Sequence, residues 1–276
     1  MLTDYHVHLR PDDLENRPER FFTAANAERY RTVADERGIA ELGVSEHIYR
    51  FTEALTVYDH PFWREQARDD LDDYCAFVRE ETDLRLGIEA DFVAGREDRI
   101  ANLLEAREWD YVVGSVHLLE GYAVDMEGEW DVWRRGDSPE RLWKRYFQTV
   151  AESARSGLFD IIAHPDLVKI WGRARPEPDT DRRRYYEPLV EACLDAGVAV
   201  ELSTAGLRKP VGELYPAQPM LELVAEADVP VALSSDAHTP HDLGAGYDRA
   251  VAALEAAGIA EIAVFERRAR RLEPVG

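Results

Sequence analysis

The chain opens with Leu2-Thr3-Asp4-Tyr5-His6-Val7-His8, a short and mainly apolar run that ends in two histidines with one residue between them. Along a β-strand, side chains two residues apart point to the same side, so His6 and His8 can reach one metal ion together. Similar runs, each with a histidine or an acid at or just beyond its end, recur along the chain. Their number and spacing predict the fold.

Seven short apolar runs alternate with longer amphipathic segments. The expected strands are Leu2–His6, Glu41–Ser45, Leu84–Ala90, Tyr111–Val116, Asp160–Ala163, Val198–Leu202 and Val229–Ser234. The expected helices are Asn26–Arg37, Trp63–Glu81, Arg96–Arg107, Pro139–Ser156, Pro188–Ala196, Pro219–Ala227 and Asp248–Ala257. Strands that alternate with helices of about ten or more residues indicate βαβ units and a parallel sheet.

The fold class that follows is α/β. Seven strand–helix units without a Pro-, Gly- or Ser-rich linker between them predict one closed or nearly closed barrel. We therefore expect residues 1–276 to form a single domain, with residues 259–276 as a peripheral C-terminal extension.

Charge and composition limit the classes of partner. The 276 residues include 33 Lys plus Arg against 55 Asp plus Glu, a formal net charge of −22 at pH 7. This charge disfavours nucleic acid and anionic membranes as main partners, because both require a basic face. No run of about 18 apolar residues predicts a membrane span, and the first residues lack a signal-peptide pattern. With only two distant cysteines, Cys75 and Cys193, the sequence favours a cytoplasmic location; it leaves the oligomeric state open.

Six of the eight histidines stand at or just after the expected strands, and Glu89 and Asp236 add carboxylates at two of the same places. The C-terminal strand ends of a β/α barrel meet at one rim, where active sites are built. We therefore predict a multinuclear metal site at this rim, and ligands of these types suit Zn, Mn or Fe(II). The six histidines are His6, His8, His47, His117, His164 and His238.

The other two histidines are interpreted as structural. His60 precedes Pro61 in a loop, and His241 follows Pro240 at an expected helix start. A single histidine at such a position is commonly incidental. The prediction of a metal site therefore depends on the joint pattern of the strand ends.

The order of the motifs resembles a known family, the PHP superfamily, named for polymerase and histidinol phosphatase. The resemblance runs from Asp4 to about Gly258, and it implies a distorted (β/α)7 barrel, similar to a TIM barrel, that holds three divalent metal ions. The segments Glu201–Pro210 and Gly212–Pro216 are similar to the histidinol-phosphatase branch. The superfamily motifs are His6-Val7-His8, Ser45-Glu46-His47, Gly87-Ile88-Glu89-Ala90-Asp91, Gly114-Ser115-Val116-His117, Ala163-His164-Pro165-Asp166 and Ser234-Ser235-Asp236-Ala237-His238.

The resemblance also implies how the ligands are shared. The first metal ion would take His6, His8, Glu89 and Asp236. The second would take His117 and His164 together with Glu89, which bridges the two ions. The third would take His47, His238 and one ligand from the loop after the first strand.

That loop departs from the family pattern. Histidinol phosphatases of this type usually supply a histidine there, and other branches use an aspartate. Here the loop reads Leu9-Arg10-Pro11-Asp12-Asp13-Leu14, without a histidine. We predict Asp13, rather than Asp12, as the third ligand.

The chemistry that the resemblance implies is phosphomonoester hydrolysis. A water bridged by two ions loses a proton near pH 7, and the resulting hydroxide would attack phosphorus. Glu89, Asp236 and His238 are the residues that we expect nearest to this step. Cationic side chains should neutralise the phosphate oxygens, and the candidates are Arg208, Lys209, Lys169 and Arg10.

Three further acids lie close in sequence to the expected ligands. Asp4 and Asp91 each stand two residues from one, and metal-bound histidines commonly donate their second N–H to a carboxylate. Both are therefore candidates for holding a ligand in place, and Glu46 is open to the same interpretation. Acidic groups around the mouth of the site could also recognise an ammonium group on the substrate.

The leading interpretation is a histidinol-phosphatase that converts L-histidinol phosphate and water to L-histidinol and phosphate, an activity of histidine biosynthesis. A phosphoesterase of the same superfamily that acts on nucleotides or phosphotyrosine is an alternative. An amidohydrolase also begins with two histidines on its first strand, but it usually bridges its metals with a carboxylated lysine, where this chain offers Glu89. A non-catalytic metal-binding domain is the remaining alternative. Such domains usually tolerate the loss of ligands, whereas this chain keeps nearly the whole expected set.

Overall fold

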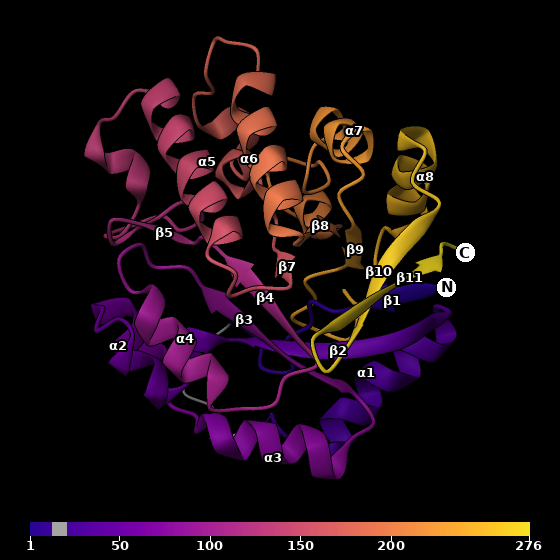
Figure 1. The fold of residues 1–276 in the computed structure, drawn as a ribbon. Coiled ribbons are helices and arrows are strands. Elements are labelled where there is room, and N and C mark those ends of the chain that lie inside the picture. Colours follow the sequence, from indigo (N-terminus) through magenta and orange to yellow (C-terminus); the bar gives the residue numbers. More distant parts are fainter. Residues whose placement is uncertain (13–20) are drawn as a thin grey trace.

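The structure, a computed structural model, describes residues 1–12 and 21–276 (Figure 1). Seven parallel strands form one sheet in the order β1-β2-β3-β4-β7-β8-β9, and each prediction of a strand is confirmed within a few residues. The strands are β1 (Leu2–Asp4), β2 (Ile39–His47), β3 (Arg85–Asp91), β4 (Tyr111–Ser115), β7 (Ile161–Ile162), β8 (Ala199–Ser203) and β9 (Val231–Ser234).

The helices lie around the outside of this sheet, as the alternating pattern predicts (Figure 1). The short strands β5 (Leu118–Leu119) and β6 (Tyr122–Ala123) form a separate hairpin after β4. The helices are α1 (Ala24–Glu36), α2 (Pro61–Gln66), α3 (Leu71–Glu81), α4 (Glu97–Glu105), α5 (Pro139–Arg155), α6 (Arg183–Ala196), α7 (Gln218–Glu226) and α8 (Tyr247–Ala257).

Two helix predictions were wrong in their bounds. The single helix expected over Trp63–Glu81 is divided into α2 and α3, because the Asp70 carboxylate accepts hydrogen bonds from the backbone N–H groups of Asp72 and Asp73 and so starts a new helix. Helix α6 begins at Arg183, five residues before the expected start, and Pro188 lies inside it. The other five predicted helices agree with the structure within two residues at each end.

The first and last strands of the sheet meet and nearly close the barrel. His8 N donates to Ala237 O at 2.8 Å, and Ala237 N donates to His6 O at 3.2 Å. These bonds lie just beyond the ends of β1 and β9, at the rim where the predicted ligands stand. The predicted (β/α)7 barrel is therefore confirmed, and its seam runs directly beside the candidate site.

The interior of the barrel is filled by residues that alternate along the strands. Tyr111 lies across the bottom of the interior, and only glycine fits beside it, because a Cβ at Gly43 or Gly87 would come within 2.3 Å of the Tyr111 side chain. Two residues beyond Gly87 on the same face of β3 stands Glu89. Because side chains two residues apart share one face of a strand, the same face of β3 carries Gly87 at the bottom of the interior and Glu89 above it.

The C-terminal segment, predicted as a peripheral extension, covers the bottom of the barrel. Strands β10 (Glu261–Glu266) and β11 (Ala269–Pro274) form an antiparallel hairpin, and Ala263, Val264 and Phe265 pack into the interior core with Tyr5 and Tyr111. The Phe265 ring meets the Tyr5 ring edge to face, with centroids 5.8 Å apart. The hairpin therefore extends the core instead of lying apart from it.

The turn of this hairpin is held by two aspartates at the bottom of the barrel. Asp110 Oδ1 accepts from Arg267 N at 3.1 Å, and the Asp160 carboxylate accepts from Arg268 Nε at 2.9 Å. At the other end of the hairpin, the Met1 ammonium donates to Gly276 O at 2.7 Å, so the two termini lie side by side (Figure 1).

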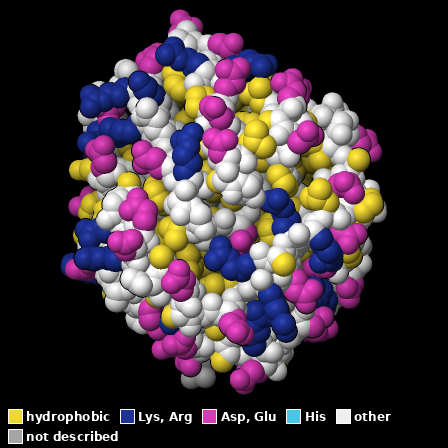
Figure 2. Space-filling model, viewed as in Figure 1, with side chains coloured by type: hydrophobic (Ala, Val, Ile, Leu, Met, Phe, Trp, Pro, Cys, Tyr) yellow, Lys and Arg dark blue, Asp and Glu magenta, His cyan; other side chains and the backbone are white. Residues whose placement is uncertain are grey.

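The face seen in Figure 2 carries acidic and basic side chains interspersed over its whole area. No helix among residues 1–12 and 21–276 has the length and apolar character that a membrane span requires.

Candidate metal centre and active-site cavity

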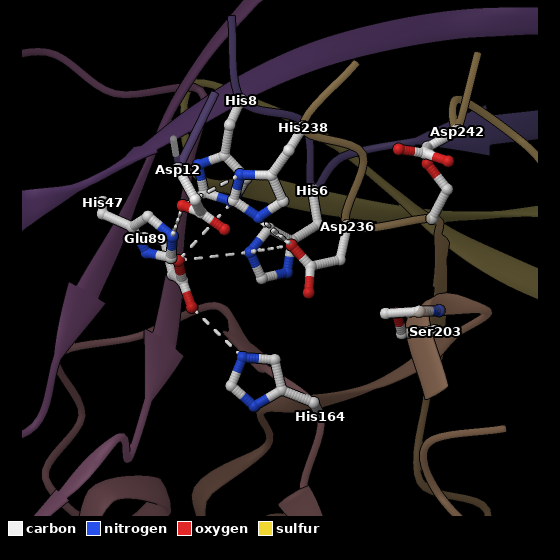
Figure 3. A network of polar contacts seen from close by, with 12 residues as sticks. His6, His8, Asp12, His47, Glu89, His164, Ser203, Asp236, His238 and Asp242 are labelled. Carbon is white, nitrogen blue, oxygen red and sulfur yellow. Dashed lines mark hydrogen bonds and ion pairs between the residues drawn. The ribbon is translucent and has the colours of Figure 1, made fainter. Parts of the chain in front are cut away.

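The strand ends bring the predicted ligands together at one rim of the barrel (Figure 3). His47 ends β2 and Glu89 lies in β3, whereas the other ligands stand in the first residues after β1, β4, β7 and β9. Five of them are at most 6% exposed: His6, His8, His47, Glu89 and His164.

Glu89 stands at the centre of the cluster, with its two oxygens facing different histidines. Oε2 lies 3.3 Å from His6 Nε2 and also contacts His47 Nδ1. Oε1 lies 3.3 Å from His117 Nε2 and 3.2 Å from His164 Nε2. This is the arrangement that a carboxylate bridging two metal ions requires.

Asp236 faces the other side of the cluster. Its Oδ1 lies 3.3 Å from His8 Nε2, 3.2 Å from His238 Nε2 and 3.7 Å from His6 Nε2. His6, His8 and Asp236 therefore converge on one point, and His6, Glu89 and His164 converge on another.

These residues fit divalent metal ions. The buried atoms His6 Nε2, His8 Nε2, Glu89 Oε2 and Asp236 Oδ1 have no hydrogen-bond partner among residues 1–12 and 21–276, which is costly for polar atoms removed from water. Two donor atoms that each lie about 2.1 Å from one ion stand about 3.0–3.4 Å apart. Most of the separations around Glu89 and Asp236 fall close to this range, so bound ions would satisfy the unpaired atoms without large movements.

The electrostatics also favour cations here. Burial opposes a charge on Glu89, but His47, His6 and His117 outweigh it and hold the pKa of Glu89 well below its usual range. Burial, with His8 nearby, lowers the pKa of His238, and burial lowers the pKa of His47 further. Ionised carboxylates and neutral imidazoles are the forms that bind metal.

Not all of the imidazoles are shifted in this direction: neighbouring carboxylates outweigh burial and raise the pKa of His6 and of His8, and the same holds for His117. Burial opposes its charge, yet Asp91 and Glu89 together raise its pKa to about 10. Its ring must therefore release a proton when it binds an ion, so metal binding at this position competes with protons.

Asp12 reaches the third group of ligands. Its Oδ1 lies 3.2 Å from His238 Nδ1 and 3.8 Å from His47 Nε2, and it accepts from Arg50 Nη2 at 2.7 Å. Figure 3 shows Asp12 between these two histidines. Asp13, the residue predicted from the sequence, lies outside the described residues.

Acids behind the ligands hold two of the imidazole rings. Asp91 Oδ1 lies 2.9 Å from His117 Nδ1, as the sequence suggests. For His6 the partner is Glu201, whose Oε1 lies 2.7 Å from Nδ1 and whose Oε2 accepts from the backbone N–H of His164. Glu201 was missed as a functional residue, although its alternation with Ala199 and Ser203 on β8 signals an acid that faces the barrel interior.

The interpretation of Asp4 as a partner of a ligand ring was wrong. Its carboxylate accepts from Ser235 N at 3.0 Å and from the Ser235 hydroxyl, so it holds the backbone beside Asp236 rather than an imidazole. Glu46 does both: its Oε1 accepts from Leu9 N and Arg10 N in the loop after β1, and its Oε2 lies 3.8 Å from His8 Nδ1.

The backbone is strained at two ligands. His164 and Asp236 have φ angles of 25° and 51°, in the left-handed region that residues with a Cβ rarely adopt. Such conformations cost on the order of 1–3 kcal/mol and cluster at functional sites. Here each turns the chain sharply at the end of a strand.

A cavity of about 260 Å³ opens onto the cluster. Its lining combines ligand residues, apolar and aromatic side chains, and a few other polar side chains. The lining residues are Asp12, His47, Tyr49, Phe62, Gln66, His117, Asp125, Met126, His164, Leu167, Ile170, Lys209, Tyr215, Asp236 and His238.

Two of the predicted phosphate-binding residues lie near this cavity. Lys209 lines it. Arg208 Nη2 donates to Ser235 O at 2.7 Å and to Asp236 O at 3.1 Å, so its guanidinium lies against the backbone of a ligand.

The other two are engaged elsewhere. Lys169 is buried, and its ammonium contacts Leu214 O at 2.7 Å, Asp166 Oδ2 at 3.0 Å and Glu213 Oε2 at 3.1 Å. Arg10 Nη1 pairs with Asp69 Oδ2 at 2.6 Å. Phosphate contacts by Lys169 or Arg10 would require these partners to be given up, and both stay predictions.

Comparison with curated proteins identifies the family. The chain is 33% identical over 267 residues to a Deinococcus radiodurans protein named probable histidinol-phosphatase, which covers 93% of this chain and 94% of that one. The chain belongs to the histidinol-phosphatase family. It is also 27% identical over 187 residues to the histidinol-phosphatase of Bacillus subtilis, across 62% of this chain and 69% of that one. No family model matches the chain.

Solved structures of this family share the fold. The histidinol phosphate phosphatase HisK of Lactococcus lactis, solved with Zn, L-histidinol and phosphate, superposes with a TM-score of 0.71 over 98% of both chains, at 18% identity. The resemblance to the histidinol-phosphatase branch and the barrel fold are thus confirmed.

His60, interpreted as structural, caps α2 by accepting from Phe62 N at 3.2 Å.

Proposed function

We propose that this protein hydrolyses L-histidinol phosphate to L-histidinol and phosphate with three bound divalent metal ions, Zn, Mn or Fe. The observation that carries the proposal is the convergence of six histidines, Glu89 and Asp236 beside a cavity that apolar and aromatic residues also line. The family relatives named histidinol-phosphatase, and the L-histidinol and phosphate in the Lactococcus lactis structure, support the choice of substrate.

The assignment of ligands follows the distances. His6, His8 and Asp236 would hold the first ion, and Glu89 would join it to a second ion held by His117 and His164. His47 and His238 would hold a third. Asp12 lies close enough to complete this third set, and we propose it in preference to Asp13.

When bound, the ions lower the pKa of water toward 7 and so supply a nucleophile at neutral pH. The residues of the chain fix where this happens. Glu89 keeps two cations close together, Asp91 and Glu201 fix the rings of His117 and His6, and Asp4 fixes the backbone before Asp236. Held in this way, Asp236 and His238 lie within 3.2 Å of one another beside the cavity.

The phosphate would meet positive charge from two directions. The ligand cluster lies on one side, and Lys209 and Arg208 lie at the end of β8. A guanidinium can bind phosphate through two parallel hydrogen bonds. In Arg208, Nη2 holds Ser235 and Asp236 and Nε lies 3.6 Å from Asp242 Oδ1, so Nη1 is the nitrogen left for a phosphate among the described contacts.

The experiment is a phosphatase screen combined with metal analysis. The purified protein is reconstituted separately with Zn, Mn and Fe(II), and kcat/KM is measured for L-histidinol phosphate, nucleoside monophosphates, phosphotyrosine and an aryl phosphate. We expect two to three ions per chain, loss of activity on chelation, and the highest kcat/KM for L-histidinol phosphate. Fewer than one tightly held ion per chain, or a clear preference for another ester, would overturn the proposal.

A further inference from the structure

Asp125 is an acid in the cavity that the metal centre does not use. Its side chain is half-buried, and among the described residues no donor contacts its buried Oδ1 atom and no ion pair reaches its carboxylate. It belongs to none of the ligand groups at the rim. A carboxylate in this position repels a phosphate group, so it must serve something other than the phosphate.

The position of Asp125 is fixed by its neighbours. Val124, the preceding residue, donates its N–H to His117 O at 3.0 Å and accepts from Trp171 Nε1 at 2.8 Å. The segment that carries Asp125 is therefore attached both to the ligand strand end and to the loop after β7. The backbone beside the carboxylate is thus held in place, while no described residue donates to its buried Oδ1 atom.

The residues that line the cavity together with Asp125 include both apolar side chains and ligand residues. Tyr49, Phe62 and Met126 line the cavity beside it, together with His117. Tyr49 stacks on His47, with ring centroids 4.6 Å apart, so the aromatic surface continues up to the ligand cluster. One cavity thus contains ligand residues, Asp125 and these apolar side chains, so a substrate bound at the cluster can contact all three.

We propose that Asp125 binds the primary ammonium group of the substrate, while Phe62, Tyr49 and Met126 contact the ring beyond it. This inference rests on the proposed function and names the residue that selects the amino ester. In L-histidinol phosphate the ammonium stands two carbons from the ester oxygen, and the imidazole lies one carbon further on. A phosphate at the metal ions, an ammonium at a carboxylate and a ring on an aromatic wall match the three parts of this cavity.

Electrostatics favour an ammonium group, rather than a neutral group, as the partner of Asp125. A half-buried carboxylate without a partner loses part of its hydration, and a cation restores that stabilisation through a charge-assisted hydrogen bond. A neutral alcohol at the same carbon would supply only an ordinary hydrogen bond. An ester with only hydrogen at that carbon would leave the Asp125 carboxylate unpaired against a hydrocarbon. Enzyme sites discriminate strongly against such a substrate, because it leaves a polar group of the site without a partner.

The test compares two esters that differ only in the ammonium group, L-histidinol phosphate and 3-(imidazol-4-yl)propyl phosphate. In the metal-loaded parent protein we expect kcat/KM to be higher for the amino ester. In Asp125→Asn we expect kcat/KM for the amino ester to fall by about 10- to 150-fold more than that for the desamino ester, or about 1.4–3 kcal/mol. The inhibition constant of L-histidinol should rise by a similar factor relative to that of inorganic phosphate.

Glu127→Gln is the matched control. Glu127 stands two residues further on with a side chain 72% exposed, so the same loss of one charge should leave the preference between the two esters intact. Metal content is measured for every variant.

The outcomes separate the two proposals. An equal loss on both esters in Asp125→Asn would mean that Asp125 acts at the ester bond, for example as a proton donor to the leaving oxygen, and would overturn the ammonium subsite. Loss of a metal ion in Asp125→Asn would overturn it as well. A parent protein that hydrolyses both esters equally well would overturn the subsite but leave a phosphatase, whereas a parent inactive on both would overturn the proposed function itself.

Discussion

The two ends of the barrel are both buried, but they are built in different ways. At the bottom, Tyr5, Tyr111 and Phe265 fill the interior, and the Tyr5 hydroxyl donates to Glu41 at 2.7 Å and accepts from Phe265 N at 3.2 Å. At the rim, the buried atoms His6 Nε2, His8 Nε2 and Glu89 Oε2 face one another without a hydrogen-bond partner in the part of the chain that the structure describes. The bottom is stabilised by the chain's own contacts, whereas the rim needs ions.

This difference separates stability from function. In β/α barrels the C-terminal strand ends carry the chemistry and the opposite face carries stability. Variants at the bottom should therefore unfold the protein more easily and leave the metal-loaded site active. Variants at the rim should change metal content or turnover. The predictions below test that separation.

Phe265→Ala should give the largest effect, on the free energy of unfolding. Phe265 is 1% exposed and packs against Tyr5, so removing its ring leaves a cavity in the interior core. Substitutions of this kind cost about 3–5 kcal/mol. We expect a loss of this size in denaturant unfolding of the metal-loaded protein, with metal content and kcat at low temperature close to those of the parent.

Leu272→Ala, in the other strand of the same hairpin, is the control for Phe265→Ala. Leu272 is 48% exposed, so its loss should change the free energy of unfolding by only about 0.5 kcal/mol. If Phe265→Ala lost metal ions while still folded, the two ends of the barrel would be coupled, and the separation would be wrong.

Glu89→Gln should give the next largest effect, on turnover. Its two oxygens face different histidines, and a neutral amide cannot hold two cations close together. We expect kcat to fall at least 100-fold, about 2.7 kcal/mol in the barrier, with the loss of at least one ion by metal analysis.

His60→Ala is the control for Glu89→Gln. His60 caps α2 and lies 3.1 Å from Gly121 O, outside the ligand groups. Its removal should leave the metal content unchanged. Near-normal kcat in Glu89→Gln would show that Glu89 does not bridge the ions.

The two ends of the barrel also differ in how much of them could be predicted from the sequence. The convergence of the candidate ligands was predictable because each stands at or near the end of a strand, and strand ends meet at one rim in any such barrel. The role of Glu201 was harder to predict, since its partner His6 lies 195 residues away and only the fold brings them together. The burial of the hairpin was missed for the same reason, although the apolar run Ile262–Phe265 is typical of a buried strand.

Local competition accounts for the other errors. The segment Trp63–Glu81 has a helical pattern throughout, but Arg68 N and Asp69 N donate to Arg50 O, and Asp70 starts a new helix. Asp4 was assigned by its spacing from His6, whereas its carboxylate turned out to hold Ser235. Spacing along the chain shows which residues are near the rim, but not which way their side chains point.

Arg208→Ala should lower kcat/KM by about 10- to 150-fold, because charge-assisted hydrogen bonds contribute roughly 1.5–3 kcal/mol. The metal content should stay at the parent value, since Asp4 still holds Ser235 N at 3.0 Å when the guanidinium is lost. Arg208→Lys, which keeps the charge but not the fork of donors, should lose less.

Either of two results would contradict this view of Arg208. If Arg208→Ala lost metal, its bonds to Ser235 O and Asp236 O would be its main role. If the variant kept both the metal and full kcat/KM, Lys209 would become the leading phosphate contact.

The smallest change that we predict is the loss of a single ion, from Asp12→Ala. Asp12 Oδ1 stands 3.2 Å from His238 Nδ1, but its side chain is 58% exposed and also pairs with Arg50, so it is the least enclosed of the proposed ligands. We expect metal analysis to show one ion fewer per chain in Asp12→Ala, with the pair joined by Glu89 retained, and no loss in Asp13→Ala. The reverse result would return the third ligand to Asp13, as predicted from the sequence. If both variants kept every ion, the third ligand of the third ion would come from another part of the chain. The loop after β1 would then take no part in binding the ions at the rim.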